Sequence, residues 1–475
     1  MIGSRWSRTR AFASTALGTL LLAAALPAQA ADVTQDRLNN ADKEPQNWLL
    51  PHQNYEAHSF SALAQIHRDN VKNLKVAFTV GLGSAIKGST LVNLENRPVV
   101  DDGYMYLTDG WGQVFKIDMR SGEFVFVQAQ AVLLATGGGP TMYKFHTPSG
   151  DKTCDGMAMA LRAGLTLRDM EMVQFHPTGL IAGPHTRITG TIIEEGLRGA
   201  GGQLLNGDGE RFMHKYDPRG ERATRDIVSR GMYAEMREGR VGPSGGLYIT
   251  MRNLDPVMVR KEFKGMVERC ADCGFDLVAG LVDVVPTAHY MMGGVVFKGD
   301  CSSELPGLFV AGEDSGGVHG ANRLGGNGVA NSTVFGGIAG DEMPGWVKGH
   351  GAFNEPDAAA IEEAIARCTA PFARKGGDLN AVREELYNLM WDDVGIVRDA
   401  ASLQRAEGKL AELAARIDTI GVDGGNRAFN MTWHDWINLK NLIMVSQSIR
   451  TAAIAREDSR GAHFRSDFPD ARSEE

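Results

Sequence analysis

Apolar and polar residues alternate in the first part of the chain, and turn residues interrupt the alternation at regular intervals. Short apolar runs at 98–100, 104–108 and 113–117 are separated by Asp-Gly turns and followed by a Ser-Gly turn. Alternation with a period of two predicts strands, and turns at this spacing join neighbouring strands as hairpins. We therefore expect a small β-meander in this segment.

The pattern changes at about Val127. The stretch Val127–Leu134 still has the composition of a strand, but beyond it helical patterns alternate with short apolar runs. Apolar residues spaced three and four positions apart predict helices, and in the last third of the chain they indicate a C-terminal bundle. The four segments with this spacing are Glu355–Ala373, Leu379–Leu389, Ala401–Ile417 and Trp433–Arg456.

The amino terminus has the composition of a secretory signal. Arg5, Arg8 and Arg10 precede an apolar run, Ala11–Leu26, and an Ala-x-Ala site ends at Ala30. The run is too short and too rich in small residues for a secure membrane span. We expect cleavage after Ala30, export by the general secretory route, and a periplasmic mature protein without an integral membrane span.

Overall composition excludes some classes of partner. A net charge of −9 gives no electrostatic footprint for nucleic acid. Five scattered cysteines do not form a disulfide framework. Cys270 and Cys273 form one CxxC at the end of a helical pattern, Val259–Arg269, but no second ligand pair accompanies it. We therefore expect no metal site.

Glycine-rich turns and clustered His, Arg and Glu residues mark the part of the chain with candidate chemistry. Glycines let a backbone approach a nucleotide closely, and the planar fork of arginine meets a carboxylate with two hydrogen bonds. The motifs stand at Leu134–Gly138, Gln174–Gly179, Glu194–Gly199, Arg222–Arg230, Pro286–Gly294, Leu308–Glu313 and Val318–Gly328. From Val127 to about Asp470 the chain, through these motifs, resembles the succinate dehydrogenase/fumarate reductase flavoprotein family.

The resemblance implies an FAD-dependent oxidoreductase that transfers hydride between flavin and a C4 dicarboxylate. It implies that His176, His289 and Arg323 hold the substrate carboxylates. It also implies that Arg225 is the general acid and that Glu195 and Arg198 relay a proton to it. A guanidinium can serve as the acid because hydride addition to one alkene carbon leaves a strongly basic centre on the other.

The same resemblance implies the flavin contacts and an electron-transfer partner subunit. Glu313 would bond the ribityl chain, and a helix opening at Gly328 would point its positive end at the flavin ring. The full expected set is Ala135, Thr136, Gly137, Asp155, Glu313, Gly328 and Val329. One position departs from the family, because Glu194 stands where a Thr is common. A second carboxylate there would disfavour a dianionic substrate.

The segment before Val127 resembles a second family, the quinoprotein (PQQ-dependent) alcohol dehydrogenases. Asn47–Trp48, Asn54–Glu56, Phe60–Ser61 and Asp109–Gly112 carry this resemblance. It covers one or two blades, whereas a propeller closes with about four to eight. Without closure there is no central quinone pocket, so PQQ binding is not expected.

The chain lacks the GxGxxG turn that binds the FAD pyrophosphate in this flavoprotein family. Three interpretations therefore stay open: an FAD-dependent enzyme, a chimeric non-catalytic fusion, and a PQQ-dependent alcohol dehydrogenase fragment. The expected fold is an α/β flavoprotein with an incomplete FAD-binding domain, a capping domain, a C-terminal helical bundle and an N-terminal propeller-like meander. The expected ranges are a signal peptide at 1–30, a propeller-like fragment at 31–126, a partial FAD-binding domain at 127–175 and 290–345, a capping domain at 176–289 and a helical domain at 355–470.

Overall fold

The computed structural model describes residues 33–50, 52–56, 58–69, 98–102, 104–108, 114–118, 124, 126–150, 152–183, 188–350, 353, 355–422, 427 and 430–472. The predicted signal peptide lies outside these residues. Contacts divide the chain into two compact units, and most of the second runs from Ser121 to Glu475. Each unit is described by itself.

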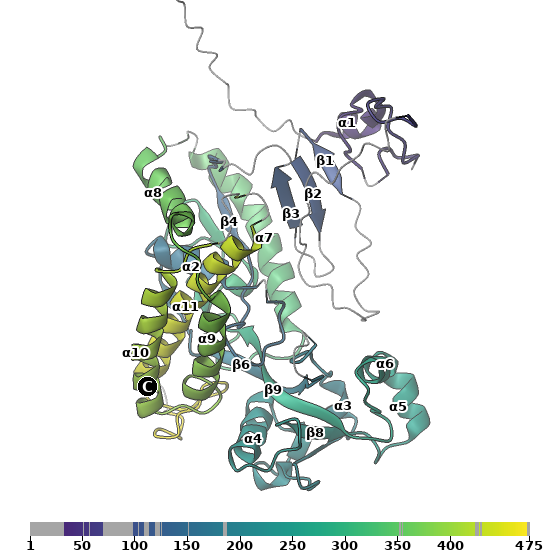
Figure 1. The fold of residues 1–475 in the computed structure, drawn as a ribbon, viewed down its shortest axis with the longest axis vertical. Helices are drawn as coiled ribbons and strands as arrows, with labels where there is room; N and C mark the ends of the chain where they lie inside the picture. Colours follow the sequence, from purple (N-terminus) through teal and green to yellow (C-terminus); the bar gives the residue numbers. More distant parts are fainter. Residues whose placement is uncertain are drawn as a thin grey trace, which may run out of the picture. The chain divides into compact units, whose positions relative to one another are not determined.

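The first unit contains the predicted β-meander. Strands β1 (Val99–Asp101), β2 (Tyr104–Thr108) and β3 (Val114–Asp118) form an antiparallel sheet in that order (Figure 1). Short helices α1 (Gln35–Asn39) and η1 (Ala41–Lys43) precede the sheet. Arg37 joins them to β1, because its guanidinium lies 2.6 Å from Glu44 and 2.8 Å from Asp101.

The second unit is built around a four-stranded antiparallel sheet in the order β6-β9-β8-β7. Strand β6 is buried along its whole length, and its buried side chains include the polar Gln174, His176 and Thr178. Helix α4 packs on β6, and α3, α5 and α6 belong to the same region (Figure 1). The bounds are Val173–Leu180 for β6, Gln203–Leu205 for β7, Leu247–Thr250 for β8, Val282–Met291 for β9, Gly196–Gly199 for α3, Arg225–Arg237 for α4, Pro256–Glu262 for α5 and Lys264–Asp272 for α6.

Two small sheets carry the glycine-rich turns. Parallel strands β4 (Val132–Leu134) and β11 (Leu308–Val310) pair with each other, and β5 (Leu167–Arg168) pairs with β10 (Gly294–Val295). The η5 turn (Gly312–Asp314) follows β11. Helices α2 (Asp155–Arg162) and α7 (Asn327–His350) belong to the same unit.

Two predicted elements are wrong in their extent. The strand expected over Val127–Leu134 begins only at Val132, because its partner strand β11 has only three residues that pair with it. Val127 is instead 73% exposed. The single helix expected over Val259–Arg269 is two helices, because the backbone of Phe263 leaves the helical region between α5 and α6.

The C-terminal bundle is confirmed, with α9 (Leu379–Asp393), α10 (Ala400–Ile417) and α11 (Met431–Ala455) packed side by side (Figure 1). Helix α8 (Ala358–Thr369) and the η6 turn (Ala370–Ala373) precede them. Each helix begins at a side-chain cap that satisfies free backbone amides: Asp357, Asp378, Asp399 and Asn430. The apolar stripes meet in one buried core that includes Trp391, Leu410 and Trp436.

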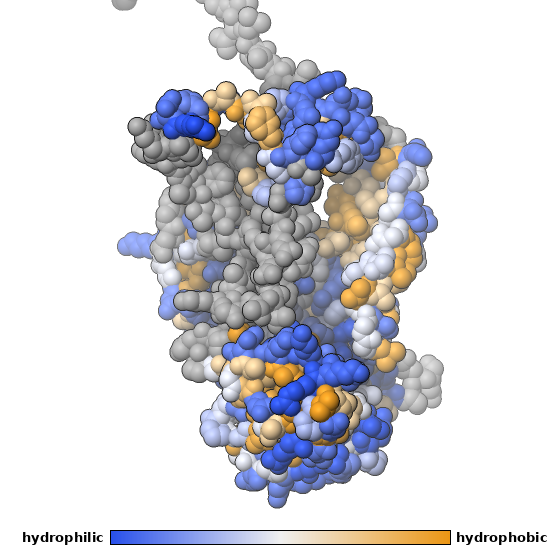
Figure 2. All heavy atoms as spheres, turned by 90° about the vertical axis from the view of Figure 1, so that its right-hand side faces the viewer, coloured by the Kyte–Doolittle hydropathy of each residue, from blue (hydrophilic) through white to orange (hydrophobic). Residues whose placement is uncertain are grey.

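Some large apolar side chains reach the surface instead, and orange spheres mark apolar surface on the face drawn in Figure 2. The exposed large apolar side chains include Val132 on β4 and Val329 and Val334 on α7, which are 48%, 75% and 54% exposed. Within the described ranges, no helix combines the length and hydropathy that a membrane crossing requires.

Candidate active site

Three of the predicted catalytic residues form a continuous chain of ion pairs. Glu195, at the start of α3, receives a hydrogen bond of 2.9 Å from Arg198 on one carboxylate oxygen. Its other oxygen accepts bonds of 2.7 and 3.1 Å from Arg225, at the start of α4. Burial by itself would raise the pKa of Glu195, but hydrogen bonds and charge from the two guanidiniums outweigh it and hold that pKa below its usual range. Glu195 therefore remains an acceptor for both arginines.

The predicted carboxylate-binding residues approach from two neighbouring strands and a loop. His176 on β6 and His289 on β9 face each other with ring centroids 5.6 Å apart. Arg323 follows β11 and η5 in the chain, and its guanidinium lies over the ring of Tyr290, 4.4 Å from the centroid. The buried Arg323 Nε has no hydrogen-bond partner in the structure. An unsatisfied buried donor of this kind is costly, and a bound anion would satisfy it.

Gln174 connects the two groups. Its side-chain amide donates to the Arg323 carbonyl at 2.7 Å and to Asn322 Oδ1 at 2.8 Å. Its amide oxygen accepts from Arg225 at 3.0 Å. The loop also lies against the ion-pair chain, because a Cβ at Gly325 would be 3.3 Å from Glu195 Oε2. One buried side chain thus joins the backbone of Arg323 to the guanidinium of Arg225.

The electrostatics favour a doubly charged anion. Burial lowers the pKa of His176 well below its usual value, and the charges of His289 and the three arginines add to the effect. Burial, followed by the charges of Arg323 and Arg225, lowers the pKa of His289 to about 3. Both histidines are therefore neutral near pH 7. Three guanidiniums and one carboxylate leave the cluster with a net charge of about +2.

Glu194, the departure from the family pattern, is exposed. Its carboxylate turns toward its own chain, since a Cβ at Gly196 would lie 3.2 Å from Glu194 Oε1. No hydrogen bond or ion pair of the described residues joins it to Arg198 or Arg225.

The turn expected to face FAD is held by a neighbouring carboxylate. Asp314 accepts hydrogen bonds from the amides of Thr136 and Gly137, the second at 3.0 Å. Glu313 accepts from Met291 N at 2.8 Å and lies so close to the backbone of Gly138 that a Cβ there would be 2.6 Å from its Oε1. Burial raises the pKa of Glu313 to about 7 and that of Asp314 to about 6.

The remaining expected flavin contacts divide into two groups. Gly328 and the exposed Val329 lie in the first turn of α7, as predicted. Ala135 lies next to the Asp314-bound turn, one residue after β4. Asp155 begins α2, but its carboxylate accepts hydrogen bonds of 2.7 Å from Thr153 and from Asn441 on α11. The structure therefore directs Asp155 toward the helical bundle.

These residues fit one half of FAD. Glu313 can accept hydrogen bonds from ribityl hydroxyls, and the buried Asn331 Oδ1 has no partner in the structure. The amino end of α7 offers the positive end of a helix dipole. The diphosphate half lacks its counterpart, because the sequence contains no GxGxxG turn. The chain therefore fits the ring and ribityl parts of the cofactor but not its pyrophosphate.

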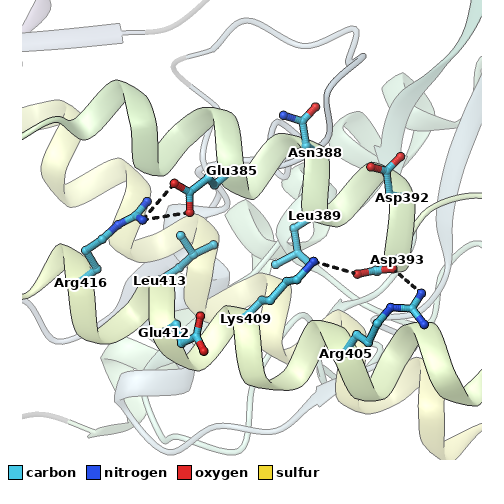
Figure 3. Close-up of a pocket in the computed structure, with 10 residues that line it drawn as sticks. All are labelled: Glu385, Asn388, Leu389, Asp392, Asp393, Arg405, Lys409, Glu412, Leu413 and Arg416. Atoms are coloured by element: carbon cyan, nitrogen blue, oxygen red, sulfur yellow. Dashed lines mark hydrogen bonds and ion pairs between the residues drawn. The ribbon is translucent and has the colours of Figure 1, made fainter.

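A cavity of about 590 Å³ lies away from this site, between α9 and α10 (Figure 3). Its cations are paired with carboxylates: Arg405 lies 2.8 Å from Asp393, and Arg416 lies 2.9 Å from Glu385. Such pairing leaves little net charge for an anionic substrate. Within the described residues, no cluster of three or more His, Cys, Asp and Glu side chains could hold a metal. The five cysteines are free thiols.

Several residues of the site had no role predicted from the sequence. Gln174 lies within the recognised QFHPTG motif, but its two-sided hydrogen bonding depends on a loop almost 150 positions later. Asp314 follows the expected Glu313 directly, yet nothing in its local pattern indicates that it holds the turn at Thr136. The sequence signal for Gln174 and Asp314 as site residues is only that each is polar within an otherwise apolar or glycine-rich stretch.

Comparison with known families agrees with this geometry. Residues 99–329 match the family described as FAD binding domain, and residues 383–475 match the family described as fumarate reductase flavoprotein C-term. Residues 48–139 match the β-propeller domain of glucose/ethanol/alcohol dehydrogenases. The chain thus has matches to both families that its sequence resembles.

Individual proteins give the same result. An uncharacterized FAD-dependent oxidoreductase of Methanocaldococcus jannaschii is 40% identical over 77% of this chain and 65% of its own length. The fumarate reductase (CoM/CoB) of Methanothermobacter marburgensis contains a polypeptide that is 39% identical over 75% of this chain and 64% of its own length. The structure of a mutant FrdA from E. coli quinol fumarate reductase superimposes with a TM-score of 0.68 at 34% identity, covering 79% of this chain and 66% of that one. The chain therefore spans slightly less than two thirds of these relatives.

Proposed function

Since the segment from about Val127 onward belongs to the succinate dehydrogenase/fumarate reductase flavoprotein family, we propose that its arginine- and histidine-lined site binds a C4 dicarboxylate and protonates or deprotonates it. The observation that carries the proposal is the unbroken contact series Arg198–Glu195–Arg225, together with Arg323, whose buried Nε has no hydrogen-bond partner. The reaction class is the interconversion of fumarate and succinate.

Charge matching supports a dianion over a monoanion. The cluster of Arg198, Arg225, Arg323 and Glu195 has a net charge of about +2, and a dicarboxylate neutralises it in a buried setting. Arg323 can bind one carboxylate in bidentate fashion, while His176 and His289 act as neutral hydrogen-bond partners. A monocarboxylate would leave one positive charge uncompensated.

The ion-pair chain supports proton delivery along one line. Arg225 would give a proton to the substrate carbon, and a proton would pass from Arg198 through the Glu195 carboxylate to restore Arg225, with solvent supplying the net proton. The contacts of Glu195 with Arg225 and Arg198 are 3.1 Å or less. Reduced FAD, when bound, would supply the hydride for such a reaction and would become oxidised FAD. With hydride and proton each adding to one alkene carbon, fumarate becomes succinate with atoms and electrons balanced.

Cofactor binding requires a diphosphate site as well as contacts to the flavin ring. Residues expected to contact the ring and ribityl parts of FAD are in the chain, among them Glu313 and Gly328, but the sequence lacks the pyrophosphate-binding turn. We therefore propose that the chain binds dicarboxylate by itself and holds FAD only when a complete dinucleotide-binding unit is supplied. The signal-like amino terminus favours a periplasmic location, and the subunit names of the relatives favour an electron-transfer partner.

Dicarboxylate binding to the full chain tests the proposal. We expect titration calorimetry to detect succinate and fumarate binding, and butyrate to bind at least ten times more weakly. Arg323→Gln should weaken succinate binding at least tenfold, because it removes the positive charge and the Nε donor that has no partner within the protein. Arg260→Gln, the same change on an exposed position of α5, is the matched control and should leave affinity unchanged. Equal affinity of the wild type for succinate and butyrate would overturn the proposal.

A further inference from the structure

The polypeptide that follows α11 returns to the substrate site. At Gly461 the backbone has a φ of +53°, and a Cβ there would lie 2.2 Å from the carbonyl oxygen of Ala321. The next amide, Ala462 N, donates to that same oxygen at 2.8 Å. Ala321 precedes Arg323 by two residues. The tail therefore rests directly on the backbone that presents the carboxylate-binding arginine.

A second set of contacts joins the tail to the helix that carries Arg225. Arg230, on α4, donates to the carbonyl of Gly461 at 3.0 Å, and its guanidinium lies over the ring of Phe464. Arg230 also contacts Asp226 at 3.4 Å. Asp226 in turn accepts a 2.8 Å hydrogen bond from Asn322. The tail, α4 and the Arg323 loop are thus joined by hydrogen bonds to one another. Gln174 adds a further link, because it contacts both Asn322 in the loop and Arg225 on α4.

The tail has a rigid anchor. His463 and Arg465 are 0% and 1% exposed. His463 Nδ1 accepts from Arg398 at 2.8 Å, and Arg465 donates to the carbonyl of Ala453 at 3.0 Å. Backbone bonds between Arg398 and both Phe464 and Ser466 fix the register. Displacement of the tail would be costly, because each broken contact leaves a buried group unpaired.

The geometry points to a positioning role for this segment, Arg456–Phe468, which we call the C-terminal strap. The strap sets the separation of Arg323 from Arg225, and through it the length of dicarboxylate that the site accepts. Gly461 and Arg230 are positioning residues in this scheme, since neither is among the groups proposed to touch substrate. The inference rests on the proposed dicarboxylate function and adds to it a determinant of substrate length.

Gly461→Ala is the direct test. A methyl group at this position must push against the Ala321 carbonyl, so the loop that carries Arg323 has to move. We expect the affinity of the full chain for succinate to fall at least tenfold, and the order of affinities for malonate, succinate and glutarate to change. Loss of stability alone would leave that order unchanged. Gly239→Ala is the matched control, because Gly239 also has a positive φ but no atom within 4 Å of the added Cβ.

Arg230→Gln provides a second variant should Gly461→Ala fail to fold. It removes the charged contact to the Gly461 carbonyl from a partly exposed position, and we expect the same change in order. If a folded Gly461→Ala or Arg230→Gln variant binds the three diacids with wild-type affinities, the positioning role of the C-terminal strap is wrong.

Hydrogen exchange separates this inference from the proposed function. In Gly461→Ala, amides of residues 321–324 should exchange faster than in the wild type, with no ligand present. Failure of the wild-type protein to bind any diacid would refute the proposed function. Unchanged exchange in this loop would refute the positioning role of the C-terminal strap. Faster loop exchange with an unaltered diacid order would also refute the claim that the strap determines length.

Discussion

Burial of His463 should make the stability of the protein depend on pH. The side chain is fully buried with Arg398 as a hydrogen-bond donor, and burial together with the Arg398 charge lowers its pKa from 6.5 to about 3. Below pH 6.5 the unfolded chain takes up a proton that the folded chain refuses. The stability linked to this residue is therefore fully present above about pH 6.5 and is lost progressively as the pH falls toward 3.

The size of the effect follows from the ordinary pKa. At pH 5 the distance to 6.5 is 1.5 pH units, and at about 1.4 kcal/mol per unit the loss is about 2 kcal/mol. Any folded-state pKa below about 4 gives nearly the same loss at pH 5, because the unfolded chain sets the limit. His463→Gln removes the titration. Its free-energy cost relative to wild type should thus shrink by about 2 kcal/mol between pH 8 and pH 5.

Urea unfolding followed by tryptophan fluorescence measures this difference at a series of pH values, since Trp391 and Trp436 lie in the same buried core as the bundle helices. His434→Gln, at an exposed position of α11, is the control. It controls for the His-to-Gln change itself. A His463→Gln difference that stays constant from pH 8 to pH 5 would refute the reasoning, because His463 would then titrate alike in both states.

Four further outcomes are expected from the site and the sequence. The purified full chain should be colourless, because the diphosphate of FAD lacks its binding turn; a flavin absorption band at near-stoichiometric occupancy would contradict this. When residues before Val127 are replaced by a complete FAD-binding unit from a related flavoprotein, Arg225→Ala should lower fumarate reduction by a reduced viologen dye by about 10²- to 10⁴-fold while flavin stays bound. Retention of most activity would mean that another group donates the proton. In the same protein, Glu194→Thr should improve use of fumarate, because it removes a carboxylate that disfavours a dianionic substrate. In a bacterial host the mature amino terminus should be Ala31, and a cytoplasmic product that still starts at Met1 would exclude export.

Local pattern was sufficient for elements whose stabilising contacts are local or periodic. Helix α10 was predicted at 401–417 and is found at Ala400–Ile417, because Asp399 caps its first turn and its apolar stripe faces the bundle core. The strands of the meander were predicted because their turns are encoded beside them. Strand β4 was predicted too long, since the length of a parallel strand depends on a partner 174 or more positions away.

The same distinction between local and long-range contacts applies to the candidate site. His176, Glu195, Arg198, Arg225, His289 and Arg323 were selected through motif resemblance. The structure joins Arg198, Glu195, Arg225 and Arg323 through Gln174, and it places the rings of His176 and His289 5.6 Å apart. Their catalytic roles stay predictions. Asp155 shows the opposite case, because its motif suggested a flavin contact whereas its carboxylate bonds to Asn441 on α11. A motif specifies residue identity, but the partner of a side chain depends on which distant element packs against it.

The C-terminal strap explains why motif reasoning reached the reacting groups but not what holds them. Each reacting group lies in a short, compositionally unusual stretch, whereas the support comes from Gly461, Ala462 and Arg230, whose types are common in any protein. What distinguishes Gly461 is a positive φ and a carbonyl 2.2 Å from its absent Cβ. Both are properties of the folded backbone. The position of Arg323 relative to Arg225 therefore depends on a segment almost 140 residues further along the chain, so a change in the bundle can alter the substrate site without touching any residue of its motifs.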